Sequence, residues 1–260
     1  MISYAQNAED VLLRRALGDR AGGYYIDVGA NDPTWCSVTR HFYDAGWDGI
    51  NIEPGRIFDK LATARARDVN LNCGLSNRPG HFCLYEFPDK PGLSTCHADV
   101  AEAHRREHRS PYVERLVNVE TLAAVCQRYV TRAIDFLKID VEGHELEVIE
   151  GGDWQRWRPR VVVVEAPTLH TETPNHLTWE HLLLGADYRY ATCDGLNRYY
   201  VRAEDEPLVK VLGVPANVMD DFVPYHHIHA YQGLGPVALR VARLVQRLQD
   251  VVRPPRKRAA

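Results

Sequence analysis

The sequence predicts an α/β fold: a mostly parallel sheet with helices on both faces and an antiparallel closing strand. Two observations carry this prediction. Short apolar runs, rich in β-branched residues, alternate along the chain with stretches of helical spacing. One run holds four consecutive valines at 161–164, which is typical of a strand buried on both faces of a parallel sheet.

Length and composition limit the class of protein. The chain has 260 residues, 45% hydrophobic and 25% charged, which is ordinary for one globular domain with insertions. Its net charge of −4 gives no general sign of nucleic-acid binding. The polar start of the chain predicts no signal peptide, and no apolar run approaches the ~18 residues of a membrane span. Six scattered cysteines without a C-x-x-C pair favour a reducing compartment, so we expect a cytoplasmic protein.

The first expected element is an N-terminal helix over residues 3–17. Ser3 is followed three residues later by Gln6, which resembles a capping box. Taken alone, the acidic pair Glu9 and Asp10 is typical of a solvated helix face.

The next two runs favour a nucleoside ligand. A β-rich run over residues 24–28 is followed by Gly29, which lets the backbone turn sharply and approach a ligand. A second run ends in Glu53, 24 residues after Gly29, and an acid at this separation binds ribose hydroxyls in nucleotide-binding βαβ units. The motif has one glycine instead of G-x-G-x-x-G, which argues against a bound diphosphate.

The middle of the chain predicts further elements and an insertion over about residues 80–119. The expected helices and strands are 57–67, 69–74, 81–87, 97–108 and 114–119. Residues 92–95 are a candidate active-site rim. The four histidines at 81, 97, 104 and 108 lack clear metal-ligand spacing and favour an exposed helix over a metal site.

The densest group of chemically active side chains follows the buried run over residues 136–139. Asp140, Glu142, His144 and Glu145 lie at the expected carboxyl end of this strand, where an open α/β sheet binds its ligands. An acidic helix start, favoured by the helix dipole, explains Glu142 and Glu145. It explains Asp140 and His144 less well, so we favour a functional site.

The last third of the chain adds a fourth acid at a strand end. Glu165 follows the valine run and joins Asp27, Glu53 and Asp140 in this position. A closing hairpin is expected around residues 194–197. We take residues 1–235 as one domain and residues 236–260 as an amphipathic basic helix and tail. The simpler interpretation is that this helix packs against its own subunit or against a second copy of the chain in a homodimer. The alternative is that it docks on an anionic membrane or a partner.

Several motifs spread over residues 4–165 together resemble the FkbM family of class I S-adenosylmethionine-dependent methyltransferases. They are Tyr4-x-Gln6-x-x-Glu9-Asp10-x-x-Leu13 and the segments 25–31, 52–54, 75–77 and 137–151. The resemblance implies a Rossmann-like fold and O-methylation, often of sugars, and so a sugar or oligosaccharide substrate. A weaker likeness is to mycobacterial enzymes that methylate the mannosides of methylmannose polysaccharide.

The resemblance also implies which residues contact S-adenosylmethionine. Residues 27–31 would hold its methionine part, Glu53 its ribose hydroxyls, and the segment ending at Ser76 its adenine. The complete set is Asp27, Gly29, Ala30, Asn31, Glu53, Ser76, Gln6 and Asp10.

His144 is the candidate general base, because an imidazole has an unperturbed pKa near neutrality. Asp140 or Glu142 would orient it or bind the acceptor. Mg²⁺ held by Asp140 and Glu165 would orient a sugar diol and ease its deprotonation, but two carboxylates are a small ligand set and the metal is left open. Two alternatives remain: an inactive cofactor-binding scaffold in glycan assembly, and an NAD-dependent oxidoreductase, which the missing glycines disfavour.

Overall fold

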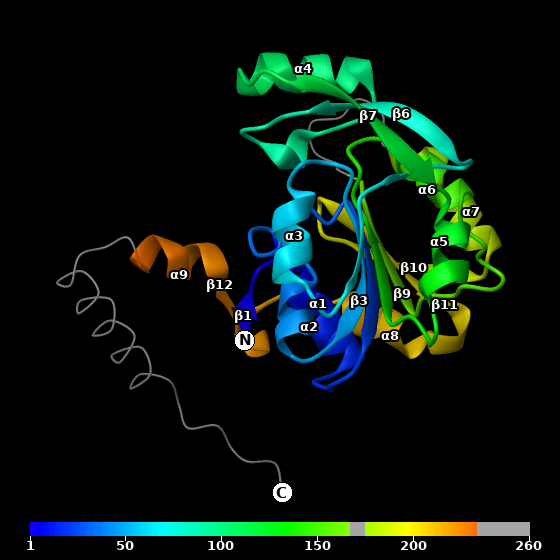
Figure 1. Cartoon of the computed structure of the whole chain (residues 1–260). Coiled ribbons are helices and arrows are strands. Elements are labelled where there is room, and N and C mark those ends of the chain that lie inside the picture. Colours follow the sequence, from blue (N-terminus) through cyan, green and yellow to red (C-terminus); the bar gives the residue numbers. More distant parts are fainter. Residues whose placement is uncertain (167–174, 233–260) are drawn as a thin grey trace, which may run out of the picture.

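The computed structural model describes residues 1–166 and 175–232, and a seven-stranded sheet lies at its centre (Figure 1). The strand order is β10-β11-β9-β8-β2-β3-β4. The strands are β2 Tyr24–Val28, β3 Asp48–Ile52, β4 Val69–Leu71, β8 Phe136–Ile139, β9 Val161–Glu165, β10 Tyr188–Cys193 and β11 Asn197–Arg202. β11 is antiparallel to both β9 and β10, while β4, β3, β2, β8 and β9 pair in parallel. The predicted parallel sheet and antiparallel closing strand are thus confirmed.

Helices cover both faces of this sheet. The helices of the described residues are α1 Glu9–Leu17, α2 Arg40–Asp44, α3 Phe58–Ala64, α4 Ala98–His108, α5 Leu122–Tyr129, α6 Glu145–Glu150, α7 Glu180–Gly185, α8 Pro207–Leu212 and α9 Tyr225–Gln232. Of these, α4 lies on the insertion and α9 projects to the side after the last strand (Figure 1). One apolar cluster contains side chains of α5, α6 and α7, and the other contains side chains of α1, α2 and α8.

The valine run of β9 explains why both faces need cover. Val162 and Val164 pack in the cluster of α5, α6 and α7, whereas Val161 and Val163 pack in the other cluster. All four are 0% exposed, and burial of one such side chain contributes about 1.5–3 kcal/mol. Alternate side chains of one strand therefore hold the two helical layers to the sheet.

The position of β2 in the sheet determines where a ligand can bind. β2 pairs with β3 on one side and with β8 on the other, so the chain leaves β2 in one direction and later returns on its opposite side. In open α/β sheets the loops diverge at such a point and leave a crevice at the carboxyl ends of the strands.

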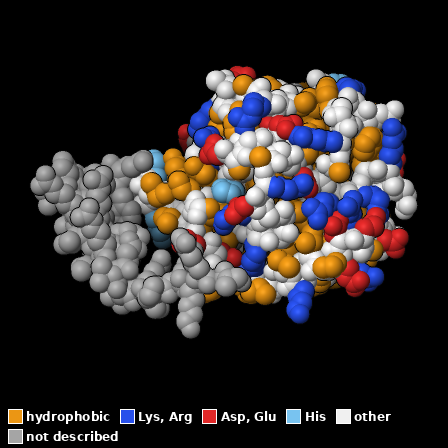
Figure 2. Space-filling model, turned by 90° about the horizontal axis from the view of Figure 1, so that it is seen from below, with side chains coloured by type: hydrophobic (Ala, Val, Ile, Leu, Met, Phe, Trp, Pro, Cys, Tyr) orange, Lys and Arg blue, Asp and Glu red, His pale blue; other side chains and the backbone are white. Residues whose placement is uncertain are grey.

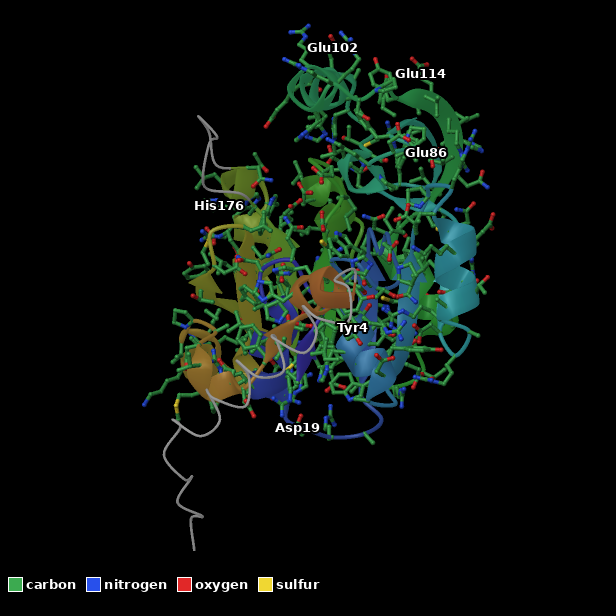
Figure 3. All side chains as sticks on the ribbon, turned by 90° about the vertical axis from the view of Figure 1, so that its left-hand side faces the viewer. Tyr4, Asp19, Glu86, Glu102, Glu114 and His176 are labelled. Carbon is green, nitrogen blue, oxygen red and sulfur yellow. The ribbon has the colours of Figure 1, made fainter. Side chains whose placement is uncertain are left out.

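The insertion forms a second sheet over this crevice. Its strands are β5 Gly74–Leu75, β6 Gly80–Glu86 and β7 Val113–Glu120, in the order β5-β7-β6. The one-turn helix η1 Pro91–Leu93 and the helix α4 connect β6 to β7. Figure 3 shows Glu86, Glu102 and Glu114 in this region, at the opposite end of the molecule from Asp19.

The N-terminal helix begins later than residue 3, so this part of the prediction is wrong. Residues Ile2–Ser3 form β1, which pairs in parallel with β12, Val223–Pro224. Ala8 precedes α1 with a left-handed φ of 64° and provides no side-chain cap. Ser3 does not cap the helix either; its Oγ donates to Asp10 Oδ1 at 2.6 Å.

Glu9 and Asp10 are buried, with 3% and 0% of their surface exposed, so the expected solvated face is also wrong. The β1–β12 pair covers Asp10, whose Oδ2 accepts from the Tyr4 amide at 2.7 Å. Glu9 Oε1 accepts from Asn197 Nδ2 at 2.9 Å. These two acids fasten the N-terminal segment and the start of β11 to α1.

The surface seen from below carries basic and acidic side chains intermixed (Figure 2). Among the described helices, none has the length and apolar character to cross a bilayer. The predicted basic helix and tail over residues 236–260 lie outside the described residues, so the domain boundary at 235 stays a prediction.

Candidate active site

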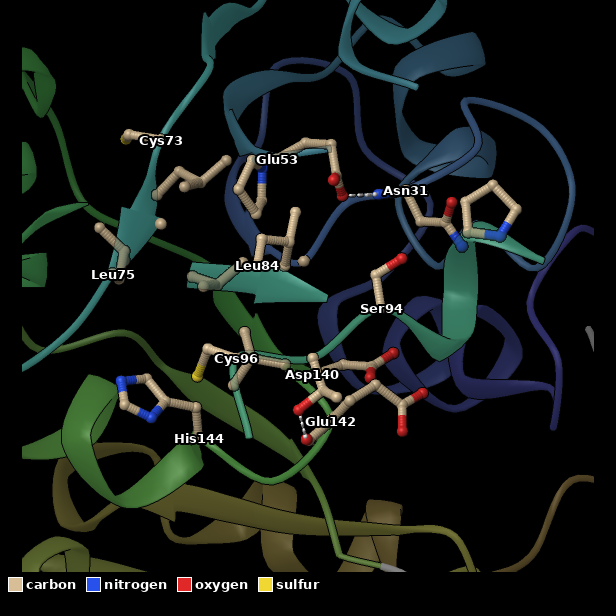
Figure 4. A pocket seen from close by; sticks show the side chains of 18 of the residues that line it. Asn31, Glu53, Cys73, Leu75, Leu84, Ser94, Cys96, Asp140, Glu142 and His144 are labelled. Atoms are coloured by element: carbon tan, nitrogen blue, oxygen red, sulfur yellow. Dashed lines mark hydrogen bonds between the residues drawn. The ribbon is translucent and has the colours of Figure 1, made fainter. Parts of the chain in front are cut away.

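A cavity opens at the carboxyl ends of β2, β3 and β8 and has about 640 Å³ of space, counting its open mouth (Figure 4). The insertion covers it with Phe82 and Leu84 of β6. Gly92, Ser94 and Thr95 of the predicted rim also line it. Its other walls include Gly29, Asn31, Glu53, Gly74, Leu75, Cys96, Asp140, Glu142 and His144.

Gly29 allows the ends of β2 and β8 to approach each other. Its φ is +75°, and a Cβ at this position would lie 1.8 Å from the backbone oxygen of Asp140. Its amide donates to the oxygen of Ile52 at 3.0 Å, which also fastens the turn to β3. Only glycine fits here, because it has no Cβ and adopts positive φ without strain.

Glu53 points its carboxylate at the turn after β2. Its Oε2 accepts from the Asn31 amide at 2.9 Å and its Oε1 accepts from the Gly55 amide at 2.7 Å. Burial raises the pKa of Glu53. Each carboxylate oxygen has a second lone pair, so this side chain can still accept from ligand hydroxyls.

Lys138 is a site residue that the sequence analysis missed. Its Nζ donates to the backbone oxygen of Gly29 at 2.7 Å and lies 3.3 Å from Asp27 Oδ1 and 3.2 Å from Asp140 Oδ2. Burial alone would lower the pKa of Lys138, but the carboxylates of Asp140 and Asp27 outweigh it and raise the pKa above its usual value. The signal was present: a charged side chain inside an apolar strand needs a partner.

Three acids form what we call the carboxylate cluster: Asp140, Glu142 and Glu165. One oxygen of each lies within 4.8 Å of the others. Asp140 and Glu165 were predicted as a pair, and Glu142 joins them because its left-handed φ of 52° turns the chain after β8. Burial, and then the neighbouring carboxylates, raise the pKa of both Glu142 and Glu165. Such a group holds protons or a cation, and three carboxylate oxygens suit Mg²⁺.

His144 lies on the cavity wall to one side of Asp140 and Glu142 (Figure 4). Its Nε2 is 3.1 Å from Ser76 Oγ, and its Nδ1 is 3.3 Å from Glu147 Oε2. His97 Nε2 also lies 3.1 Å from Nδ1, so the described neighbours of the two ring nitrogens are Ser76, Glu147 and His97, while an orienting role for Asp140 or Glu142 stays a prediction. Burial lowers the pKa of His144, which favours the neutral ring.

The structure does not bring every predicted cofactor residue to the cavity. Asp27 and Ala30 are buried behind its wall, where Asp27 Oδ2 accepts from Thr39 Oγ1 at 2.9 Å. Asp10 is enclosed by the N-terminal segment, and Gln6 lines a second hollow beside Asp194. Ser76 reaches the site through its bond to His144.

Residues 27–190 match the family model described as the methyltransferase FkbM domain, which is more than half of the 260-residue chain. This chain belongs to the FkbM methyltransferase family. The matched range of the FkbM domain includes the turn at Gly29, Glu53 and the carboxylate cluster, and excludes Gln6 and Asp10. The resemblance drawn from the motifs is confirmed at the level of the family, whereas the likeness to mycobacterial enzymes stays a prediction.

Two named proteins are similar to this FkbM domain. Methyltransferase sdnD of Sordaria araneosa is 36% identical over 170 residues, which cover 55% of this chain and 65% of the length of that protein. The crystal structure of Methyltransferase FkbM from Methylobacillus flagellatus KT has a TM-score of 0.46 and 17% identity. The structural match covers 76% of this chain and 48% of the Methylobacillus chain.

Proposed function

We propose that this FkbM domain is an S-adenosylmethionine-dependent O-methyltransferase that acts on a hydroxyl of a sugar or oligosaccharide. One observation carries the proposal: the cavity bounded by Gly29 and Glu53 is contiguous with Asp140 and Glu142 of the carboxylate cluster. A nucleoside pocket thus adjoins an acidic wall suited to a polyhydroxylated acceptor.

The residues of the cavity fit the cofactor. The turn at Gly29 provides close backbone approach, Glu53 has free lone pairs for ribose hydroxyls, and Leu75 and Phe82 give apolar walls for a base. S-adenosylmethionine supplies, when bound, a methyl group on a cationic sulfonium. The acidic wall favours such a cation by Coulomb attraction.

His144 is the general base in this proposal. His144 Nδ1 faces both the Glu147 carboxylate at 3.3 Å and His97 Nε2 at 3.1 Å. A carboxylate can only accept, so this proposal puts the proton of the neutral ring on Nδ1. Nε2 then carries the lone pair that accepts from Ser76 Oγ at 3.1 Å, and an acceptor hydroxyl in place of Ser76 would give its proton to the same atom.

Mg²⁺ on the carboxylate cluster is the optional part of the proposal. Asp140, Glu142 and Glu165 would hold the ion by one oxygen each. Lys138 pairs with Asp140, but the charge of Glu142 and Glu165 would otherwise have to be neutralised by protons. A bound divalent ion orients neighbouring sugar hydroxyls and lowers their pKa.

Transfer of a radiolabelled methyl group to a panel of glycans tests the function. His144→Ala should lower turnover by about 100-fold or more and leave cofactor affinity within a few fold. His81→Ala, on the exposed end of β6, is the matched control and should retain full turnover. Equal turnover of both variants would remove His144 from the mechanism, and activity that resists a chelator would end the Mg²⁺ part. Cofactor binding without transfer to any glycan would favour the inactive scaffold.

The cytoplasmic location and the homodimer remain predictions of the sequence. The six cysteines are free thiols in the structure.

A further inference from the structure

A second group of ligating side chains lies where the insertion meets α6. Cys96 Sγ and one ring nitrogen each of His97 and His144 lie within 4.8 Å of one another. His97 Nε2 is 3.1 Å from His144 Nδ1, and Glu147 Oε2 is 3.3 Å from the same Nδ1. We propose that Cys96, His97 and His144 form a Zn²⁺ site, with the Glu147 carboxylate beside the ring of His144.

Hydrogen bonds alone do not match a donor to each acceptor in this group. His144 Nδ1 offers either one proton or one lone pair, yet it faces both His97 Nε2 and the Glu147 carboxylate. The Cys96 thiol is only a weak donor. One cation among the Cys96 sulfur and the two ring nitrogens would accept an electron pair from each of them.

The donor set selects the metal. A thiolate and two imidazoles are typical Zn²⁺ ligands, and a water molecule can complete a tetrahedral site with three protein ligands. Mg²⁺ prefers oxygen ligands and would favour the carboxylate cluster instead. The two clusters therefore differ in the ion that each would bind.

The surroundings of the site resemble the outer layer of a metal centre. With Nδ1 on the ion, His144 Nε2 carries the proton and donates to Ser76 Oγ, which lies 3.1 Å away. The loop that carries Cys96 and His97 is held as well: Thr95 Oγ1 accepts from the His97 amide at 3.1 Å and donates to the Glu142 oxygen at 2.7 Å.

A filled site has two consequences. Cys96 and His97 lie just before α4, while His144 and Glu147 lie at the start of α6, so the ion joins the insertion to the core. Zn²⁺ also removes the free lone pair of His144 and therefore inhibits methyl transfer. This second consequence rests on the proposed function; the binding of Zn²⁺ does not.

Zn²⁺ titration of the chelator-treated full-length chain, in competition with a chromophoric chelator, measures the affinity. We expect one equivalent to bind. Cys96→Ser and His97→Gln should each weaken binding by at least the ~10–100-fold that loss of an outer partner costs, and Ser76→Ala should weaken it within that range. The matched controls Cys83→Ser and His81→Gln, both on β6, should bind like the unchanged protein.

Replacement of Zn²⁺ by Co²⁺ reports the ligands directly. The near-ultraviolet charge-transfer band of a cobalt–thiolate bond should appear in the unchanged protein and in Cys83→Ser, and be absent in Cys96→Ser. Equal Zn²⁺ affinity of the unchanged protein and the Cys96→Ser/His97→Gln variant would overturn the site. Binding lost in Asp140→Asn but kept in Cys96→Ser would overturn it too. Tight Zn²⁺ binding without inhibition would leave the site standing and reject His144 as the base.

Discussion

Two residues determine how closely the strand ends approach at the cavity. Gly29 lets the turn after β2 touch the backbone of Asp140, and Lys138 neutralises the acids on both sides of that contact. A substitution of each residue leads to a prediction about stability. The same substitution at a matched residue elsewhere in the chain serves as the control.

Gly29→Ala should destabilise the protein more than Gly46→Ala. Both glycines have positive φ, +75° and +88°, which costs alanine about 1–2 kcal/mol. At Gly46 a Cβ would meet nothing within 4 Å, whereas at Gly29 it would meet the Asp140 oxygen at 1.8 Å. The clash should add about 1–3 kcal/mol to the loss of unfolding free energy in Gly29→Ala, measured by urea denaturation. Equal losses would mean that the strand ends can separate freely.

Lys138→Met should lower the free energy of unfolding by about 3–5 kcal/mol, because it leaves the buried carboxylate of Asp27 without its counter-charge. Lys60→Met is the control. Its ion pair with Asp32 has a lysine side chain that is 61% exposed, and such a pair is worth about 1 kcal/mol or less. Similar losses in denaturant titrations of the two variants would contradict the role given to Lys138.

The site residues that the sequence revealed share one property: each follows a strand that its own apolar run identifies. Glu53, Asp140 and Glu165 could be placed at one sheet edge for this reason. The approach of His97 to His144 could not be predicted, because 47 residues separate them and the insertion between has no pattern that fixes its orientation. Lys138 was overlooked because the apolar residues around it indicated a fully apolar strand.

At the scale of the element, α1 shows how tertiary contacts override local signals. Ser3 and Gln6 have the spacing of a capping box, yet Ser3 belongs to β1 and bonds to Asp10. The helix start is set by the left-handed Ala8 and by buried acids with distant partners. Propensity is a weak guide where such contacts decide.

The acids of α1 predict how stability depends on pH. Burial raises the pKa of Glu9 from 4.5 to about 7 and that of Asp10 from 3.8 to about 6. The folded protein thus binds protons that the unfolded chain has lost. The stability that these two acids contribute is therefore fully present below their usual pKa values. It falls as pH rises to 7, by about 1.4 kcal/mol per pH unit for each such proton.

Urea denaturation across this pH range measures the slope. Glu9→Gln should make it shallower, while Glu107→Gln, an exposed residue of α4, should leave it unchanged. Stability that rises with pH over the same interval would show that the two acids are ionised in the folded state.

At the scale of the whole molecule, ligand binding should stabilise the entire fold, because the cavity is built from β2, β3, β8 and the insertion together. S-adenosylhomocysteine at 100 times its Kd should raise the free energy of unfolding by about 2.7 kcal/mol.

Thermal unfolding with each ligand checks this expectation. Glu53→Ala should lose most of the stabilisation by S-adenosylhomocysteine. Glu114→Ala, an exposed position on β7, should keep it. NADH should give no gain. Stabilisation by NADH in place of S-adenosylhomocysteine would favour the oxidoreductase alternative.

Lys138 has one more consequence for the molecule. The same ammonium group bonds to the oxygen of Gly29 and to Asp140, so it belongs to the nucleoside pocket and to the acidic wall at once. Under the proposed function, we expect a cation that attracts Asp140 to weaken the contact between Asp140 and Lys138 and so to alter the turn at Gly29. Thermodynamic reciprocity then requires that the nucleoside change the affinity for the cation by the same factor. We therefore expect occupancy of one site at this sheet edge to change the affinity of the other, without movement of a domain.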